Sequence, residues 1–145
     1  MTNLPPRAGT YVLVLHLAQP ARLRIGKLGR FDFPAGWYLY VGSARGPGGL
    51  AARVGRHLRS SPKPHWHIDY LRRAASVEEV WWQAGKARRE CAWSQAIGAR
   101  PGAEIIAPGF GASDCECETH LWQVKRKPTT SRSIYSCARA PSAFF

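Results

Sequence analysis

Residues 9–15, Gly-Thr-Tyr-Val-Leu-Val-Leu, and residues 37–42, Trp-Tyr-Leu-Tyr-Val-Gly, decide the fold of this 145-residue chain. Both runs are rich in β-branched, aromatic and other apolar residues, a composition typical of β-strands. Residues 33–36, Phe-Pro-Ala-Gly, break the chain before the second run. We therefore expect two strands that place Tyr11 and Tyr40 on neighbouring strands of one sheet.

The spacing of apolar residues differs between the segment that joins these two strands and the segment that follows them. Residues 22–27 alternate charged and apolar side chains, so we expect them to form a hairpin with the first strand. From Leu50 the period becomes that of a helix, with apolar residues at every fourth position. This helix puts Arg53 and His57 on one flank and turns Arg56 and Arg59 outward.

The rest of the chain alternates short elements with loops. We expect further helices over 67–75 and 87–97 and further strands over 77–82 and 119–124. Glycines mark residues 108–117 as a loop. A chain of this length is expected to form one domain, which we place at residues 1–124. Residues 125–145 carry five basic residues, no acidic residue and no periodicity, so we expect a basic disordered tail.

The charge of the chain indicates a polyanionic partner. Twenty-one Lys and Arg face nine Asp and Glu, a net charge of +12, and residues 1–63 hold ten basic residues against the single acid Asp32. Arginine outnumbers lysine sixteen to five, and the guanidinium fork matches phosphate geometry. We therefore expect DNA as the partner, although a basic surface can also serve only solubility.

The sequence also indicates where the protein acts. The early apolar run Tyr11–Leu15 ends at His16, and neither a signal peptide nor a membrane span is recognisable. We expect a cytoplasmic protein with no membrane partner. In that reducing compartment the four cysteines do not predict a disulfide framework.

Five residues together offer the chemistry of phosphodiester hydrolysis. A base, an anion clamp, a proton shuttle and a metal ligand are available from Tyr11, Tyr40, Arg53, His57 and Glu90. A tyrosine with an ordinary pKa of about 10 is a poor base unless nearby cations lower it, and Arg53, Arg56 and a metal ion are expected to do so. Each residue also has a structural alternative, as a sheet aromatic, a solvated helix face or a surface ion pair.

The ordered set of motifs resembles the GIY-YIG endonuclease superfamily. Within it, the chain is similar to a branch of small uncharacterised proteins that stand alone or are fused to a DNA glycosylase of the endonuclease III type. The resemblance runs from about Gly9 to Val124. The motifs that carry it are Gly9-Thr10-Tyr11, Phe33-Pro34-Ala35-Gly36, Tyr40-Val41-Gly42-Ser43-Ala44, Gly48-Gly49-Leu50, Arg53, Arg56-His57-Leu58, His65-Trp66-His67-Ile68-Asp69-Tyr70-Leu71, Glu90 and Gly109-Phe110-Gly111-Ala112-Ser113-Asp114-Cys115.

The resemblance implies an α/β fold, a small antiparallel sheet of three core strands flanked by helices, that hydrolyses phosphodiesters with one divalent cation, Mg²⁺ or Mn²⁺. It implies that Tyr11 and Tyr40 face the site, that Arg53 contacts the scissile phosphate and that Glu90 binds the metal. The glycosylase fusions suggest a role in DNA repair and a repair glycosylase as a partner. The residues expected to contact DNA are Arg45, Arg56, Arg59, Lys63, His65 and His67.

Two departures leave an alternative open. Two triplets name the superfamily, and here they are Gly9-Thr10-Tyr11 and Tyr40-Val41-Gly42. Residues 12–39 separate them, a spacer longer than the superfamily usually has, which predicts an elaborated hairpin. No asparagine follows Asn3, so Ser113 or Asp114 would stand where the superfamily often has one. The alternative function is a catalytically inactive nucleic-acid-binding module of the same fold.

A second group of residues has the side chains of a zinc site. Cys115, Cys117 and His120 form a C-x-C-x-x-H pattern, although zinc sites more often use C-x₂-C pairs. The competing explanation makes these cysteines buried small hydrophobes. Trp66 likewise either stacks on a splayed base or belongs to the core. A zinc-stabilised adaptor for a protein partner is the third possible function.

Overall fold

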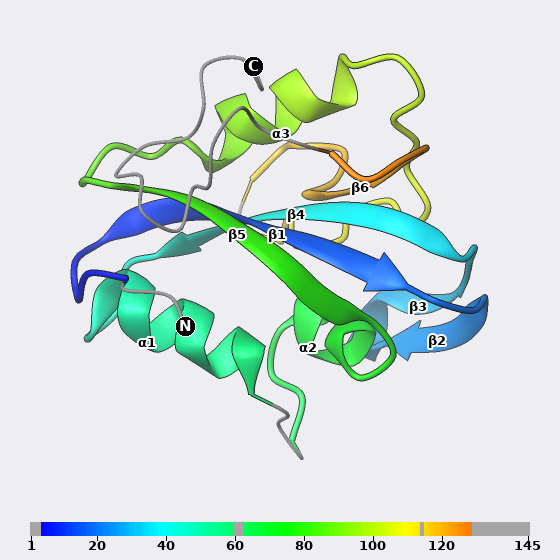
Figure 1. Ribbon diagram of the computed structural model, residues 1–145, viewed down its shortest axis with the longest axis horizontal. Helices are drawn as coiled ribbons and strands as arrows, with labels where there is room; N and C mark the ends of the chain where they lie inside the picture. The colour runs from blue at the N-terminus through cyan, green and yellow to red at the C-terminus, as the bar shows by residue number, and fades with distance from the viewer. Residues whose placement is uncertain (1–3, 60–62, 114, 129–145) are drawn as a thin grey trace.

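A computed structural model of the chain describes residues 4–59, 63–113 and 115–128. Its main element is a four-stranded antiparallel sheet in the order β5-β1-β4-β6 (Figure 1). The strands are β1 (Gly9–Leu17), β4 (Gly36–Ala44), β5 (Ser76–Ala84) and β6 (Leu121–Val124). The expectation of three core strands was too low, because β6 pairs with the first half of β4 and adds a fourth.

The pairing of β1 with β4 explains why residue 42 is a glycine. β1 and β4 pair from end to end, which sets Tyr11 directly opposite Gly42. A Cβ atom on Gly42 would collide with the Tyr11 ring. Tyr40 lies two residues from Gly42 and so faces the same side of the sheet, with its ring centroid 6.5 Å from that of Tyr11. The expected pair of tyrosines on neighbouring strands is confirmed.

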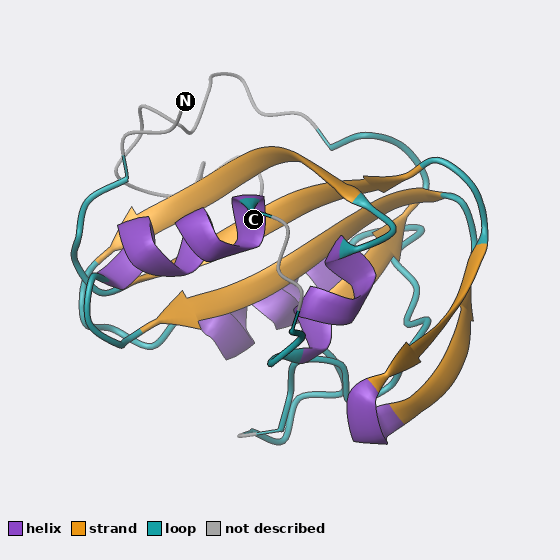
Figure 2. Cartoon of the chain, turned by 90° about the horizontal axis from the view of Figure 1, so that it is seen from below, coloured by secondary structure: helices purple, strands orange, loops and turns teal. Residues whose placement is uncertain are grey.

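Helices cover both faces of the sheet. α1 (Gly49–Leu58) and α2 (His67–Arg72) lie against the face of the two tyrosines, and α3 (Glu90–Gly98) covers the opposite face, as Figures 1 and 2 show from two directions. Successive side chains of β1 and β4 point to opposite faces of the sheet, so both strands contribute to the hydrophobic core on each face. The core beneath α3 is formed by Val12, Val14, Leu39, Val41, Trp81, Trp93 and Ile97.

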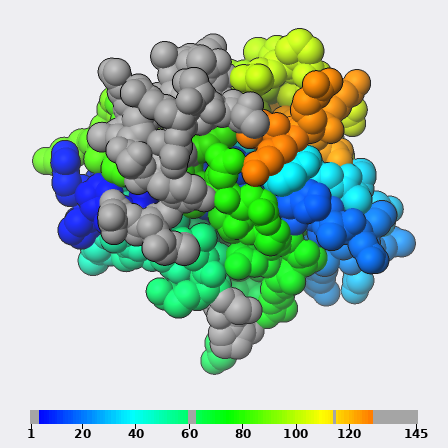
Figure 3. Space-filling model, viewed as in Figure 1, coloured from blue at the N-terminus to red at the C-terminus, as the bar shows by residue number. Residues whose placement is uncertain are grey.

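The long spacer between the triplets is a separate hairpin. β2 (Ala21–Ile25) pairs with β3 (Gly29–Phe33) through the short 3-10 helix η1 (Gly26–Leu28), and the two strands form their own sheet. The expectation that residues 22–27 pair with the first strand was wrong. Both edges of β1 are already taken by β4 and β5, so β2 had to find another partner. In Figure 3 this hairpin forms the blue right-hand edge of the molecule.

The helix boundaries differ from the expected ones by a few residues. α1 buries His57 along with Leu50 and Val54, whereas Leu58 is only half-buried. α3 begins at Glu90, three residues later than expected, because Gly85 has a φ of 139° and the next residues form a loop. α2 ends at Arg72, where the N–H groups of the following turn bind the carbonyl of Leu71.

The end of the described chain contacts the sheet. Lys127 pairs with Glu79, at 3.5 Å between Nζ and Oε2, and lies 5.5 Å from the centroid of the Trp37 ring. The predicted tail therefore begins with residues that touch the fold, and residues 129–145 of it lie outside the described part. Among the described residues, no helix has the length and apolar character needed to span a membrane.

Candidate active site

The centre of the candidate site is a hydrogen bond between two buried side chains. The Tyr11 hydroxyl lies 2.7 Å from Nε2 of His57, and the side chains come from β1 and α1. Tyr40 packs against both, with ring centroids 6.5 Å from Tyr11 and 6.3 Å from His57. The structure thus brings together three of the residues predicted to be catalytic.

Burial sets the protonation of both tyrosines. Burial and the neighbouring Tyr40 hold the pKa of Tyr11 well above its ordinary value, and the Arg53 guanidinium offsets this only in part. Burial likewise raises the pKa of Tyr40 to about 12, again against the effect of Arg53. The expectation that the arginines lower these pKa values was wrong, because desolvation outweighs them. Both hydroxyls are protonated at neutral pH.

His57 is neutral for the same reason. Burial lowers its pKa to about 4, and the guanidiniums of Arg53, Arg56 and Arg72 together add to this effect while Asp69 opposes it. A neutral imidazole can accept a proton at one ring nitrogen. In the tautomer that carries its proton on Nδ1, His57 accepts the hydrogen bond of the Tyr11 hydroxyl at Nε2. Nδ1 itself is buried and has no hydrogen-bond partner among the described residues.

Asp69 belongs to the motif of residues 65–71, but the sequence assigned it no role in this site. Its Oδ1 lies 4.0 Å from Nδ1 of His57, and its side chain is 6% exposed. Its Oδ2 accepts hydrogen bonds from the main-chain N–H groups of His65 and Trp66 and from Arg56. Burial raises the pKa of Asp69, but these donors outweigh it and hold the pKa below its ordinary value. Asp69, His57 and Tyr11 therefore form a carboxylate, imidazole and hydroxyl series.

Arg53 and Arg56 share one aromatic platform. Their guanidinium carbons lie 4.2 Å and 4.8 Å from the centroid of the Trp66 ring, within the range of a cation–π interaction. Arg53 also donates to the carbonyl of Ser43 at 2.9 Å. The expectation that Arg56 faces outward was wrong, because its ion pair with Asp69, at 2.9 Å, draws it toward α2. Trp66 thus packs on the core and orients two cations rather than standing free.

Glu90 lies in a different layer from the tyrosines, at the start of the helix that covers the opposite face. Its Oε2 atom is buried and has no hydrogen-bond partner within the described part of the chain. Its charge acts to raise the pKa of Cys91 and of His120. The structure therefore brings the other four predicted catalytic residues together, while Glu90 stands at the start of α3.

Two of the residues predicted to bind DNA hold loops in place. Arg45 donates to the main-chain carbonyls of Lys86 and Ala87, at 2.7 and 2.9 Å, and so fixes the loop before α3. His67 accepts a hydrogen bond at Nδ1 from the main-chain N–H of Gly111, at 2.8 Å. Burial lowers the pKa of His67. These contacts give Arg45 and His67 a structural role, and their contact with DNA stays a prediction.

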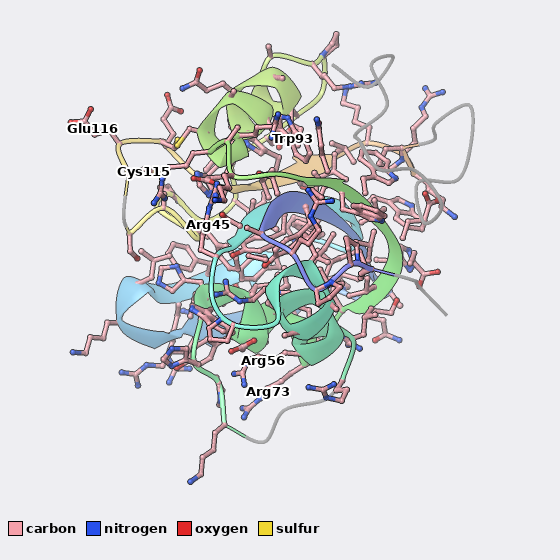
Figure 4. All side chains as sticks on the ribbon, turned by 90° about the vertical axis from the view of Figure 1, so that its left-hand side faces the viewer. Arg45, Arg56, Arg73, Trp93, Cys115 and Glu116 are labelled. Carbon is pink, nitrogen blue, oxygen red and sulfur yellow. The ribbon has the colours of Figure 1, made fainter. Side chains whose placement is uncertain are left out.

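The other predicted DNA contacts lie at the surface. Arg59, Lys63 and His65 are exposed, and the His65 ring packs on Trp66 with centroids 4.7 Å apart. In the view of Figure 4, Arg45 lies between Cys115 and Arg56, with Arg73 beyond Arg56. Basic side chains therefore mark this side of the molecule.

The tyrosine cluster is closely packed. Tyr11, His57 and Tyr40 are 1%, 2% and 8% exposed, whereas Arg53 and Trp66 are half-buried and form its outer boundary. Cavities of about 440 Å³ lie elsewhere, one against residues 124–128 and another between α3 and residues 116–119. A substrate group must therefore meet the cluster at the protein surface, which suits a polymer better than a small molecule.

The cysteine cluster has a fourth member that the sequence pattern missed. Cys91, Cys115, Cys117 and His120 place their ligand atoms within 4.8 Å of one another, and the group can hold a metal ion such as zinc. The three thiols are half-buried, so the interpretation as buried small hydrophobes was wrong. Cys91 was detectable in principle, because the C-x-C-x-x-H pattern supplies three ligands and tetrahedral zinc takes four.

A family model described as a domain of unknown function, DUF123, matches residues 10–142. The matched region continues past Val124 into the segment predicted as a tail. Comparisons with curated proteins and with solved structures gave no match.

Proposed function

The chain belongs to the DUF123 family, and we propose that it is a divalent-metal-dependent DNA endonuclease with a GIY-YIG-like fold. The observation that carries the proposal is the 2.7 Å hydrogen bond between Tyr11 and a neutral, buried His57, beside Tyr40 and Arg53. The residues occur in the order that the GIY-YIG resemblance implies. They also lie on elements that fit that resemblance, two paired strands and the helix that follows them.

The Tyr11–His57 pair supplies a route for a proton. Since both tyrosines are protonated at neutral pH, Tyr11 acts as a relay: its hydroxyl takes a proton from the attacking water as it gives its own to Nε2 of His57. Asp69, whose Oδ1 lies 4.0 Å from Nδ1 of His57, stabilises the imidazolium that results through its charge. Tyr40 lies against the same imidazole and restricts the space around the reacting oxygen.

Arg53 supplies the anion clamp. Its guanidinium donates to the Ser43 carbonyl and interacts with the Tyr11 side chain. A guanidinium has five N–H donors, so others remain for a nonbridging phosphate oxygen. Stacking on Trp66 fixes the plane of the guanidinium before substrate arrives. A preorganised cation of this kind stabilises the charge that develops in the transition state.

Glu90 suits a magnesium or manganese ion. A buried carboxylate oxygen without a partner is costly, and a cation beside it would remove that cost. Mg²⁺ takes few protein ligands and completes its shell with water and substrate phosphate. When bound, the ion would stabilise the leaving oxygen and the scissile phosphate. The Glu90 carboxylate would hold it.

The surface charge supports DNA as the substrate. The net charge of +12 attracts a polyanion. Arg59, Lys63 and His65 are exposed, and His65 packs on Trp66. A role in DNA repair in the cytoplasm, beside a glycosylase, belongs to the same proposal and rests on the resemblance.

Cleavage assays test the proposal directly. The protein is incubated with flapped, branched, abasic and plain duplex DNA, with Mg²⁺, Mn²⁺ or a chelator. We expect cleavage of at least one substrate that requires the cation and is lost in Tyr11→Phe. DNA that stays intact with either cation would contradict the proposal.

The alternative, an inactive nucleic-acid-binding module, is favoured by one observation. Burial raises the pKa of both tyrosines. Neither therefore forms the tyrosinate that would be needed as a base at neutral pH. Salt-sensitive binding without cleavage on all four substrates would establish this alternative. Absence of binding at low salt would exclude both functions.

A further inference from the structure

We propose that Cys91, Cys115, Cys117 and His120 bind one structural zinc ion that fastens the start of α3 to the loop before β6. Its ligands neighbour Glu90, whose charge acts on Cys91 and His120, but the donor set stands without the proposed nuclease activity.

The separations of the four ligand atoms are close to those of a zinc site. Nε2 of His120 lies 3.4 Å from Sγ of Cys115 and 3.9 Å from Sγ of Cys91, and all four atoms lie within 4.8 Å of one another. Zinc–sulfur bonds of about 2.3 Å put the ligand atoms of a tetrahedral site roughly 3.8 Å apart. If the longest separation between two ligand atoms shortens by about 1 Å, the four atoms reach these distances.

The main chain presents the histidine in a fixed orientation. His120 donates its N–H to the carbonyl of Phe110 at 2.7 Å, and its own carbonyl accepts from Val41 in β4 at 2.9 Å. Its ring is therefore anchored to the edge of the sheet and is 5% exposed. Cys91 comes from the first turn of α3 on the other side. A metal bound here would join three parts of the fold: sheet edge, loop and helix.

The loop that carries two of the thiols has few other anchors. Residues 113 and 115–118, which omit only the undescribed position 114, are exposed or half-buried. They include Glu116 and Glu118, whose exposed carboxylates face water. A segment of this kind gains little from apolar burial, yet it brings two thiols against the thiol of Cys91. Convergence of three thiols and an imidazole is what a zinc ion requires and what packing alone does not explain.

Zinc is the cation that this donor set selects. Three sulfurs and one imidazole nitrogen form a closed Cys₃His set, the composition of structural zinc sites, whereas magnesium and calcium prefer oxygen ligands. No fifth ligand from the protein is grouped with the four in the described residues. The closed set indicates a structural ion rather than a catalytic one.

Metal content and spectroscopy test the inference on the full chain. Protein produced with zinc and dialysed under reducing conditions should hold about one zinc ion per chain, and cobalt substitution should give the intense visible bands of a tetrahedral site with thiolate charge transfer. Cys91→Ser should lose most of the zinc, while Glu116→Gln, an exposed neighbour between two ligands, should keep it. Thermal unfolding of the wild type should move to lower temperature with a strong chelator.

Each of the following results would overturn the proposal, and none requires a folded variant. They are wild-type protein without zinc after growth in zinc-containing medium, cobalt spectra of an octahedral ion, and melting that a chelator leaves unchanged. A disulfide between two of these cysteines, seen as a mass two hydrogens lower than that of the reduced chain, would overturn it too. Failure of the nuclease assays with zinc present would leave the zinc site standing, so the two proposals fail separately.

Discussion

Acid sensitivity of folding should trace to one residue, His57. The perturbation is His57→Gln, which removes the titrating ring but keeps an amide able to accept a hydrogen bond from Tyr11. The unfolded chain binds a proton on a histidine below pH 6.5, whereas the folded chain does not protonate His57 until about pH 4. Between these values the unfolded state holds more protons, so acidification favours unfolding.

The size of the effect follows from the pKa difference. One pKa unit corresponds to about 1.4 kcal/mol, so the drop from 6.5 to about 4 amounts to roughly 3 kcal/mol of unfolding free energy. The side chain is 1% exposed, so solvent screening takes little from this figure. The stability is fully present above pH 6.5 and is lost as the pH falls to about 4.

Urea unfolding followed by tryptophan fluorescence at pH 7 and pH 4 measures the effect. The difference between wild type and His57→Gln isolates the contribution of His57 from that of every other titrating group. We expect the wild type to lose about 3 kcal/mol more than the variant on acidification. His65→Gln, which removes an exposed histidine, should behave as the wild type does. If the two proteins lose the same free energy, the buried neutral His57 of this account does not exist.

Three further predictions follow from the geometry. Gly42→Ala, whose Cβ would collide with the Tyr11 ring, should destabilise the fold by about 1–3 kcal/mol, whereas Gly46→Ala, with open space around it, should change the melting temperature little; equal melting temperatures would refute the packing. Arg53→Ala should slow cleavage at least ~10²-fold, while Arg59→Ala should mainly weaken binding and reduce its salt dependence; small and equal effects would make Arg53 a surface charge. Deleting residues 129–145 should lower DNA affinity at low salt with little change in melting temperature, and a shift of several degrees would show that the segment supports the fold.

The sequence predicted the strands and helices that local chemistry dictates. The runs around Tyr11 and Tyr40 became β1 and β4, and the helical period from Leu50 became α1. The sequence did not predict which strands pair, because residues 22–27 alternate equally well in either sheet. Only the competition of β4 and β5 for the edges of β1 sent β2 to β3.

The candidate site was predicted less completely for a related reason. Tyr11, His57 and Arg53 could be grouped from their order and helical spacing, and they do lie together. The roles of Asp69 and Trp66 depend on how α2 docks against α1, which no local pattern specifies. Desolvation of the tyrosines also depends on that docking, so their pKa values were expected to shift in the wrong direction.

The most direct test of the central claim compares wild type with Glu90→Gln in single-turnover cleavage with Mg²⁺. The amide nearly preserves the shape of the side chain but removes its charge. We therefore expect a loss of at least ~10²-fold in cleavage rate with nearly unchanged DNA affinity and melting temperature. A Glu90→Gln protein that cleaves as fast as the wild type would contradict the assignment of Glu90 as the metal ligand and, with it, the proposed mechanism.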